Sequence, residues 1–126
     1  MNCWIGSRYM ISGVGPQIAP EPGYRTFTVE SETAITGASD VWTIADEDEA
    51  SISDPWWLVT MNNSRPFASF PATRHARGYN LSFADGHAEL WNLLDTNTVS
   101  PLLKVNAANS DWIKLKQHTT TKFGGF

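Results

Sequence analysis

An Asp-Gly pair between two alternating runs is the feature that most narrows the fold of this 126-residue chain. The run 79–84 alternates apolar with small or polar residues before Asp85 and Gly86, and the run 87–93 follows. Such alternation favours half-buried strands, and Asp-Gly suits a tight turn whose two central residues adopt positive φ angles. The sequence therefore predicts a β-hairpin over residues 79–92, with Asp85 and Gly86 as its structural turn.

A two-residue turn also predicts how the two strands pair. It places Phe83 opposite Ala88 and Leu81 opposite Leu90. A slip of one residue would move every side chain of one strand to the other face. The predicted register gathers Tyr79, Leu81, Phe83, Ala88 and Leu90 on one face, and Asn80, Ser82, His87, Glu89 and Trp91 on the opposite face.

The rest of the chain predicts a few further elements. Branched and aromatic residues favour strands over 40–45 and 55–60, and alternation favours a short strand over 25–30. Residues 31–36 can form one helical turn that ends at Gly37. The opening stretch to Tyr24 is rich in glycine and proline, which predicts a surface loop.

A terminal helix is expected over residues 110–118. Ser110 or Asn109 can cap its start, and its apolar contacts would be Trp112, Ile113 and Leu115. The composition, 41% hydrophobic and only 17% charged, supplies enough apolar material for one core. We expect a strand-dominated α+β fold: an antiparallel sheet built around the 79–92 hairpin, with long loops and a short C-terminal helix, in a single domain spanning 1–126.

Charge is distributed unevenly along the chain. The stretch 30–54 holds eight acidic residues and no Lys or Arg, whereas the second half is basic. The acidic stretch is expected to meet either a cation or the chain's own basic loop. The net charge of −4 and the scarcity of basic residues argue against nucleic-acid binding. No apolar run could cross a membrane, no secretory signal is visible, and the single cysteine, Cys3, rules out an intrachain disulfide.

The residues around the hairpin resemble a family signature. His75 is followed by nine residues and then by Asp85-Gly86, which is similar to the H-x9-DG domain of bacterial prepilin-like proteins, relatives of the type II secretion pseudopilins. The likeness covers roughly residues 1–122 and also includes Trp42-Thr43-Ile44-Ala45-Asp46-Glu47, Ser51-Ile52-Ser53-Asp54, Asp111-Trp112 and Gln117-His118-Thr119-Thr120.

This resemblance implies an extracytoplasmic head domain, periplasmic or at the cell surface, that docks on other pilin-like subunits or secretion components. Such proteins normally begin with a prepilin leader and a long hydrophobic helix, and the printed chain has neither. We therefore expect Met1 to begin a fragment or a shortened reading frame.

His75, Asp85 and His87 also allow a catalytic interpretation. A histidine can act as general base with an aspartate as its orienting carboxylate, or both can bind a metal. The strand between His75 and Asp85 is about 20 Å long at roughly 3.3 Å per residue, so the two lie at opposite ends unless the chain folds back. The structural interpretation is favoured: Asp85 and Gly86 form the turn, and His75 caps or packs the loop.

The acidic stretch is the better candidate for a bound ion. Asp46, Asp48 and Asp54 offer hard oxygen ligands of the kind that calcium requires, with Glu47 or Glu49 completing the set. The spacing is not that of an EF-hand. Type II pseudopilins often hold calcium in a loop of the sheet domain, which the resemblance extends to this chain. A solvated turn, or one paired with Arg65, Arg74 or Arg77, is favoured over a specific calcium site.

Two further functions remain alternatives to the interaction head. One is a small calcium-dependent hydrolase of lactones or esters, in which His75 or His87 activates water; no sequence motif selects that substrate. The other is a carbohydrate-binding module that uses Trp56 or Trp57, which point to opposite faces if they lie on a strand. Core packing is expected for Trp42 and Trp91. No organic cofactor is expected.

Overall fold

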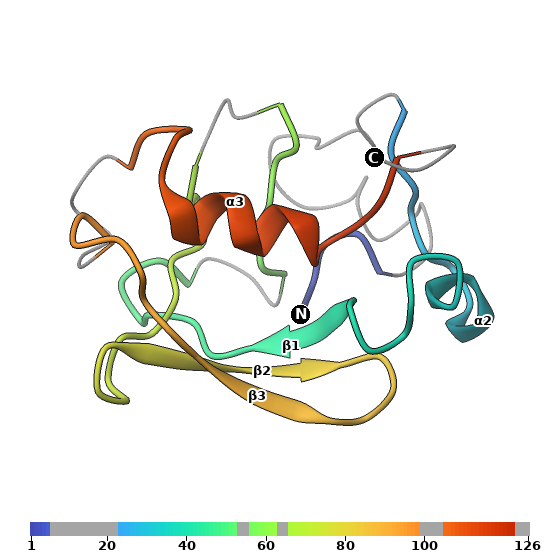
Figure 1. Ribbon diagram of the computed structural model, residues 1–126, viewed down its shortest axis with the longest axis horizontal. Coiled ribbons are helices and arrows are strands. Elements are labelled where there is room, and N and C mark those ends of the chain that lie inside the picture. Colours follow the sequence, from blue (N-terminus) through green and yellow to red (C-terminus); the bar gives the residue numbers. More distant parts are fainter. Residues whose placement is uncertain (6–22, 53–55, 63–65, 99–104, 123–126) are drawn as a thin grey trace.

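A three-stranded antiparallel sheet with one helix above it forms the framework of the molecule (Figure 1). The computed structural model describes residues 1–5, 23–52, 56–62, 66–98 and 105–122. The strands are β1 (Trp42–Ala45), β2 (Gly78–Phe83) and β3 (Ala88–Asn92), in that order across the sheet, and the helices are α2 (Glu30–Thr33) and α3 (Ser110–Gln117). The prediction of a strand-dominated α+β fold built on an antiparallel hairpin is confirmed.

The β2–β3 hairpin is present, but its turn differs from the predicted one. The Phe83 N–H donates to the His87 carbonyl (2.9 Å) and the Gly86 N–H donates to the Phe83 carbonyl (3.0 Å), which leaves three residues in the loop. Gly86 has a positive φ of 93°, whereas Asp85 does not have a positive φ. A type I turn followed by a left-handed glycine is a common three-residue hairpin loop. The prediction of two positive φ angles is therefore wrong for Asp85 and correct for Gly86.

The longer loop shifts the register by one residue. Leu81 pairs with Glu89 and Tyr79 with Trp91, instead of Leu81 with Leu90. The shift moves the side chains of β3 to the faces opposite those predicted. Trp91 is consequently only 5% exposed among the core residues, and Leu90 is 50% exposed on the other face.

A bulge in β1 places side chains two residues apart on opposite faces of the sheet. Trp42 pairs with Phe83 and Ile44 with Ser82, so one extra residue lies between the two pairs. A bulge of this kind reverses the normal alternation of a strand. Trp42 is fully buried in consequence, while Ile44, two residues later, is 59% exposed.

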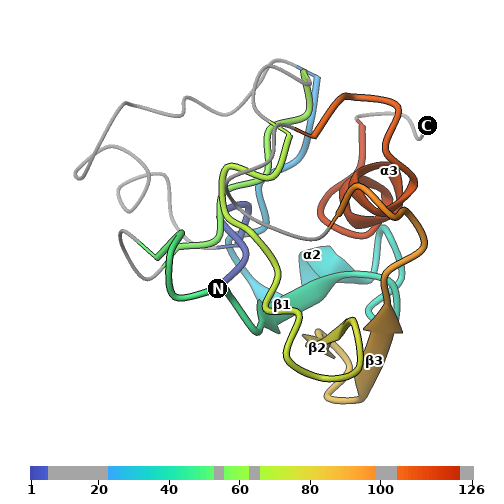
Figure 2. The ribbon, with the colours of Figure 1, turned by 90° about the vertical axis from the view of Figure 1, so that its left-hand side faces the viewer.

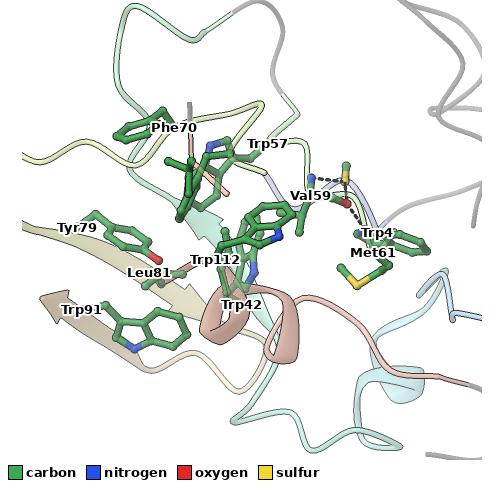
Figure 3. Packing of buried hydrophobic residues seen from close by; sticks show 14 of the residues in the cluster. Trp4, Trp42, Trp57, Val59, Met61, Phe70, Tyr79, Leu81, Trp91 and Trp112 are labelled. Atoms are coloured by element: carbon green, nitrogen blue, oxygen red, sulfur yellow. Dashed lines mark hydrogen bonds between the residues drawn. The ribbon is translucent and has the colours of Figure 1, made fainter. Parts of the chain in front are cut away.

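The core between the sheet and α3 is largely aromatic (Figure 3). The Trp57 ring meets Trp42 edge-on, with 5.1 Å between ring centroids, and contacts Tyr79 at 5.9 Å. On the helix side, Phe67 packs against Trp112 at 5.3 Å. Edge-to-face pairs of this kind add to the free energy gained by burying the rings.

The first residues of the chain enter the core rather than a surface loop. Asn2 is fully buried, and its Nδ2 donates to the carbonyls of Trp42 (2.9 Å) and Thr119 (3.1 Å). Its Oδ1 accepts from the Trp4 N–H (3.0 Å). The loop prediction is wrong for residues 2–4, and its segment 6–22 lies outside the described residues.

Two of the predicted strands are wrong, because the segments do not join the sheet. Phe27, in the segment 25–30, forms one isolated bridge with Ile5. Trp57 forms one with Asn2, and Pro55 lies outside the described residues. Both aromatic side chains are almost fully buried, so these segments contribute to the core without extending a ladder.

The terminal helix begins and ends close to the predicted bounds. The Asn109 side chain caps α3 by accepting from the Trp112 N–H (3.0 Å), which decides between the two expected caps. Trp112 and Leu115 are buried as predicted, but Ile113 is 39% exposed, so its expected core contact is wrong. Among the described helices, none is long and apolar enough to span a membrane.

Candidate functional site

Asp85, His87, Glu89 and Trp91 form a polar cluster that runs from the hairpin turn along β3, and we call it the tip cluster. Asp85 Oδ1 accepts from the His87 N–H (3.1 Å) and lies 2.5 Å from His87 Nδ1. On the other side of the ring, His87 Nε2 lies 3.0 Å from Glu89 Oε1. Both imidazole nitrogens therefore contact carboxylates.

The cluster continues from the carboxylate of Glu89 into the hydrophobic core. Trp91 Nε1 donates to Glu89 Oε2 (2.6 Å), and Lys114 of α3 places its Nζ 4.0 Å from the centre of the Trp91 ring. The His87 ring stacks on Phe83, with an interplanar angle of 6°. Alternation along β3 predicts that His87, Glu89 and Trp91 share a face, and they do. The strand alone does not predict that this face turns toward the core, or that Lys114 of α3 contacts it.

The electrostatics of the tip cluster favour its charged forms. The hydrogen bond from the His87 backbone, together with its ring, lowers the pKa of Asp85. The hydrogen bonds from Trp91 and His87 lower the pKa of Glu89. The hydrogen bonds to Asp85 and then to Glu89 raise the pKa of His87. Because both ring nitrogens of His87 contact carboxylates, neither is left unengaged to act as a base, and the contacts clamp the turn against β3.

A second cluster lies where β1 ends and β2 begins. The acidic loop, residues 46–49, follows β1, and Arg74 contacts both Asp46 (3.8 Å) and Glu49. His75 Nε2 lies 3.4 Å from Asp46 Oδ2. A hydrogen bond from its own backbone, and then the charge of Arg74, lower the pKa of Glu49. The acidic loop thus contacts Arg74 of the chain's own basic loop, one of its two expected partners.

The backbone between His75 and β2 makes an uncommon turn. Ala76 and Arg77 both have positive φ angles, 49° and 63°, and the Gly78 N–H donates to the His75 carbonyl (2.8 Å). Two consecutive positive φ angles with this hydrogen bond are the features of a type I′ turn, which normally takes Asn or Gly. The turn brings His75 back against the start of β2, beside the acidic loop.

His75 and Asp85 therefore do not share a site. His75 contacts Asp46 at the open end of the hairpin, whereas Asp85 contacts His87 at the turn. The sheet register places the length of β2 between them (Figure 1). Both residues make local contacts of the kind that a structural role requires, and that role stays a prediction.

The candidate calcium ligands are placed only in part. Asp46 contacts Arg74 and His75, and Asp48 Oδ1 accepts from the Ala50 N–H (2.9 Å); Asp54 lies outside the described residues. Within the described part of the chain, no group of three His, Cys, Asp or Glu side chains is arranged to hold a metal ion. The calcium site stays a prediction.

A buried carboxylate has a structural role that sequence reasoning did not assign. Asp111, in the first turn of α3, is almost fully buried and accepts from the N–H groups of Leu94 (2.8 Å) and Asp95 (2.9 Å) and from the Thr98 hydroxyl (2.8 Å). Its position after the cap Asn109 was the available signal. These bonds tie the segment after β3 to the helix, so Asp111 serves the fold.

The face of the sheet turned away from α3 is covered by no described segment. We call it the outer face; it carries Ile44, Asn80, Ser82, Ala88 and Leu90. Figures 1 and 2 show α3 on the other side and no described segment on this one. Of the two tryptophans considered for sugar stacking, Trp57 is buried, and Trp56 is half-buried and packed against the core.

No protein-family model, no curated protein and no solved structure matches this chain. The likeness to the H-x9-DG proteins therefore rests on the residues quoted above.

Proposed function

We propose that this domain is a non-catalytic, pseudopilin-like head that binds other proteins of a type II secretion or pilus-like assembly. The observation that carries the proposal is the separation of the signature residues. His75 bonds the acidic loop at one end of the hairpin, and Asp85 bonds His87 at the other. Each residue makes stabilising contacts at a different end of the hairpin, which favours a rigid docking module over a shared catalytic site.

The outer face supports an interaction role. Ile44 and Leu90 are 59% and 50% exposed on a sheet whose other face is packed. Single exposed apolar residues are common on any protein, but here two of them lie on one strand-built face with small neutral neighbours. A surface of this kind can dock on a neighbouring subunit without a change in the fold.

Calcium stabilisation belongs to the same proposal. Asp46 and Asp48 lie on one loop, and a calcium ion bound there would compete with Arg74 for Asp46. Titration with calcium during thermal melting tests this part alone. We expect the melting temperature to rise in wild type and to rise less in Asp48→Asn; no rise at millimolar calcium would remove calcium from the proposal.

In-cell photo-cross-linking tests the interaction role. A photoreactive phenylalanine replaces Ile44 on the outer face, and the matched control carries it at Ile35, which is 58% exposed beyond α2. We expect Ile44 adducts with proteins that carry a prepilin leader, and few at Ile35. Adducts of equal yield at both positions, or none, would contradict the proposal. Calcium-dependent cleavage of esters or lactones that is lost in His87→Gln would replace it by the hydrolase alternative.

A further inference from the structure

β3 is an edge strand whose outward side is uncovered. The sheet ends at β3, and no isolated bridge of the described residues involves residues 88–92. Figure 2 shows β3 as the outermost strand, with no described segment beyond it. Among the described residues, the edge is therefore open along its whole length.

The register identifies which backbone groups point outward. The hydrogen bonds from Phe83 to His87 and from Leu93 to Arg77 (2.8 Å) show that odd-numbered residues of β3 bond to β2. In an antiparallel pair the intervening residues point the other way. The N–H and carbonyl groups of Ala88, Leu90 and Asn92 consequently face outward.

This edge lacks lysine, proline and a bulge, three of the usual protections against pairing with another strand, and its one charged residue, Glu89, is engaged with His87 and Trp91. Natural edges carry lysine, proline or a bulge that discourages a second strand. The three residues whose backbone is free, Ala88, Leu90 and Asn92, are uncharged, and β3 pairs with β2 in an unbroken register. Leu90, at the centre of the strand, is half exposed.

We propose that β3 pairs antiparallel with β3 of a second copy of this chain, about a two-fold axis at Leu90. This inference rests on the proposed interaction role and adds a second copy of the chain to the expected partners. Leu90 lies opposite Leu90 of the other copy, and Ala88 lies opposite Asn92. The pairing satisfies the outward backbone groups of all three residues and extends the sheet to six strands.

Charge favours a second copy as the occupant. In this register Glu89 lies opposite Trp91 of the other copy, not opposite its own counterpart. Lys114 sits 4.0 Å from the centre of the Trp91 ring and near Glu89 of its own copy, so the pairing gathers two glutamates and two lysines on one face. The outer faces of the two sheets then join, and the two Leu90 side chains meet at the centre of an uncharged strip. Self-pairing thus brings opposite charges together on one face and apolar groups together on the other.

Sedimentation velocity over a concentration series tests the pairing. Leu90→Lys adds edge protection, and the matched control Ile35→Lys places the same charge at a similarly exposed site away from the edge. Wild type and Ile35→Lys are expected to shift toward twice the monomer mass with rising concentration, whereas Leu90→Lys stays monomeric with an unchanged circular dichroism spectrum. A wild type that stays monomeric, or a Leu90→Lys variant that still dimerises, would overturn the inference.

Amide hydrogen exchange adds a residue-level measurement on the unmodified protein. We expect the exchange of the Leu90 amide to slow with rising concentration, while that of Glu89, which already bonds β2, changes little. Concentration-independent exchange at Leu90 would overturn the inference. If the protein stays monomeric but Ile44 still forms adducts with prepilin-like proteins, only the self-pairing is contradicted. If the protein dimerises but forms no such adducts, only the proposed function is contradicted.

Discussion

Trp91 and Leu90 are neighbours whose burial depends entirely on the hairpin register. With the observed pairing, Trp91 is 5% exposed and Leu90 is 50% exposed. Trp91→Ala is therefore expected to cost about 3–5 kcal/mol of stability, the range for removing a large aromatic side chain from a core. Leu90→Ala removes a side chain that is only half buried, and is expected to cost about 1 kcal/mol. The two-residue turn predicts the opposite order.

Urea unfolding at low protein concentration, followed by circular dichroism, measures both changes. Comparable m values in the variants would show that the midpoints report stability rather than a change in the unfolded state. Trp91→Phe is the matched control, because it keeps most of the ring volume and removes the 2.6 Å hydrogen bond to Glu89. A Leu90→Ala variant that loses as much stability as Trp91→Ala would refute the observed register.

Three further predictions follow from the contacts described above. Gly86→Ala is expected to cost about 1–2 kcal/mol of stability, because φ is 93° at Gly86. No atom lies within 4 Å of an added Cβ, so the cost is conformational alone. Gly86→Asn should lose less stability, and an unchanged melting temperature in the alanine variant would contradict the turn. Asn2→Asp is expected to cost about 3 kcal/mol or more by thermal unfolding, since a buried carboxylate cannot donate to the carbonyls of Trp42 and Thr119; a stability equal to wild type would exclude this anchoring role. The pKa of His87 is raised in the folded state, so its contacts contribute their full stability below the unfolded pKa of 6.5 and lose it as the pH rises through the folded pKa. The pKa values of Asp85 and Glu89 are lowered, so their contribution to stability is present above the unfolded pKa values of 3.8 and 4.5 and is lost as the pH falls through the folded values. The clamp is thus strongest between the carboxylate and imidazole titrations, and NMR titration of the His87 ring should give a lower pKa in Asp85→Asn than in wild type; equal values in the two proteins would argue against the clamp.

The hairpin could be predicted from sequence, but its register could not. Asp85-Gly86 is compatible with a two-residue turn and also with a type I turn that ends in a left-handed glycine. The choice between them depends on which side chains of β3 reach the core. The expectation that Trp91 packs in the core already conflicted with the two-residue register, and the structure resolves the conflict in favour of the tryptophan.

The residue pattern that predicted strands over 25–30 and 55–60 reflects burial of these segments rather than pairing in the sheet. Phe27 and Trp57 are both buried, yet each takes part in only one isolated bridge with the N-terminal residues. Aromatic and branched residues fit any half-buried extended segment, so their pattern cannot tell a ladder from a core-lining loop. Which segment the N-terminal residues would join is a tertiary question that local sequence does not answer.

The candidate site likewise combines contacts that local sequence predicts with contacts that it does not predict. Alternation places His87, Glu89 and Trp91 on one face of β3, so the tip cluster follows from local spacing. Lys114 reaches the Trp91 ring from α3, and Arg74 reaches the acidic loop through an uncommon turn. Contacts between distant segments of this kind depend on how the helix and loops pack, which no local pattern encodes.

A double-mutant cycle on His75→Ala and Asp85→Ala tests most directly whether the two signature residues brace separate corners of the hairpin. The free energy of unfolding is measured by urea titration for wild type, both single variants and the double variant. Separate corners predict that the loss in the double variant equals the sum of the two single losses, because distant residues without shared partners act additively. A double variant that loses clearly less or clearly more than that sum would place His75 and Asp85 in one site and contradict the account.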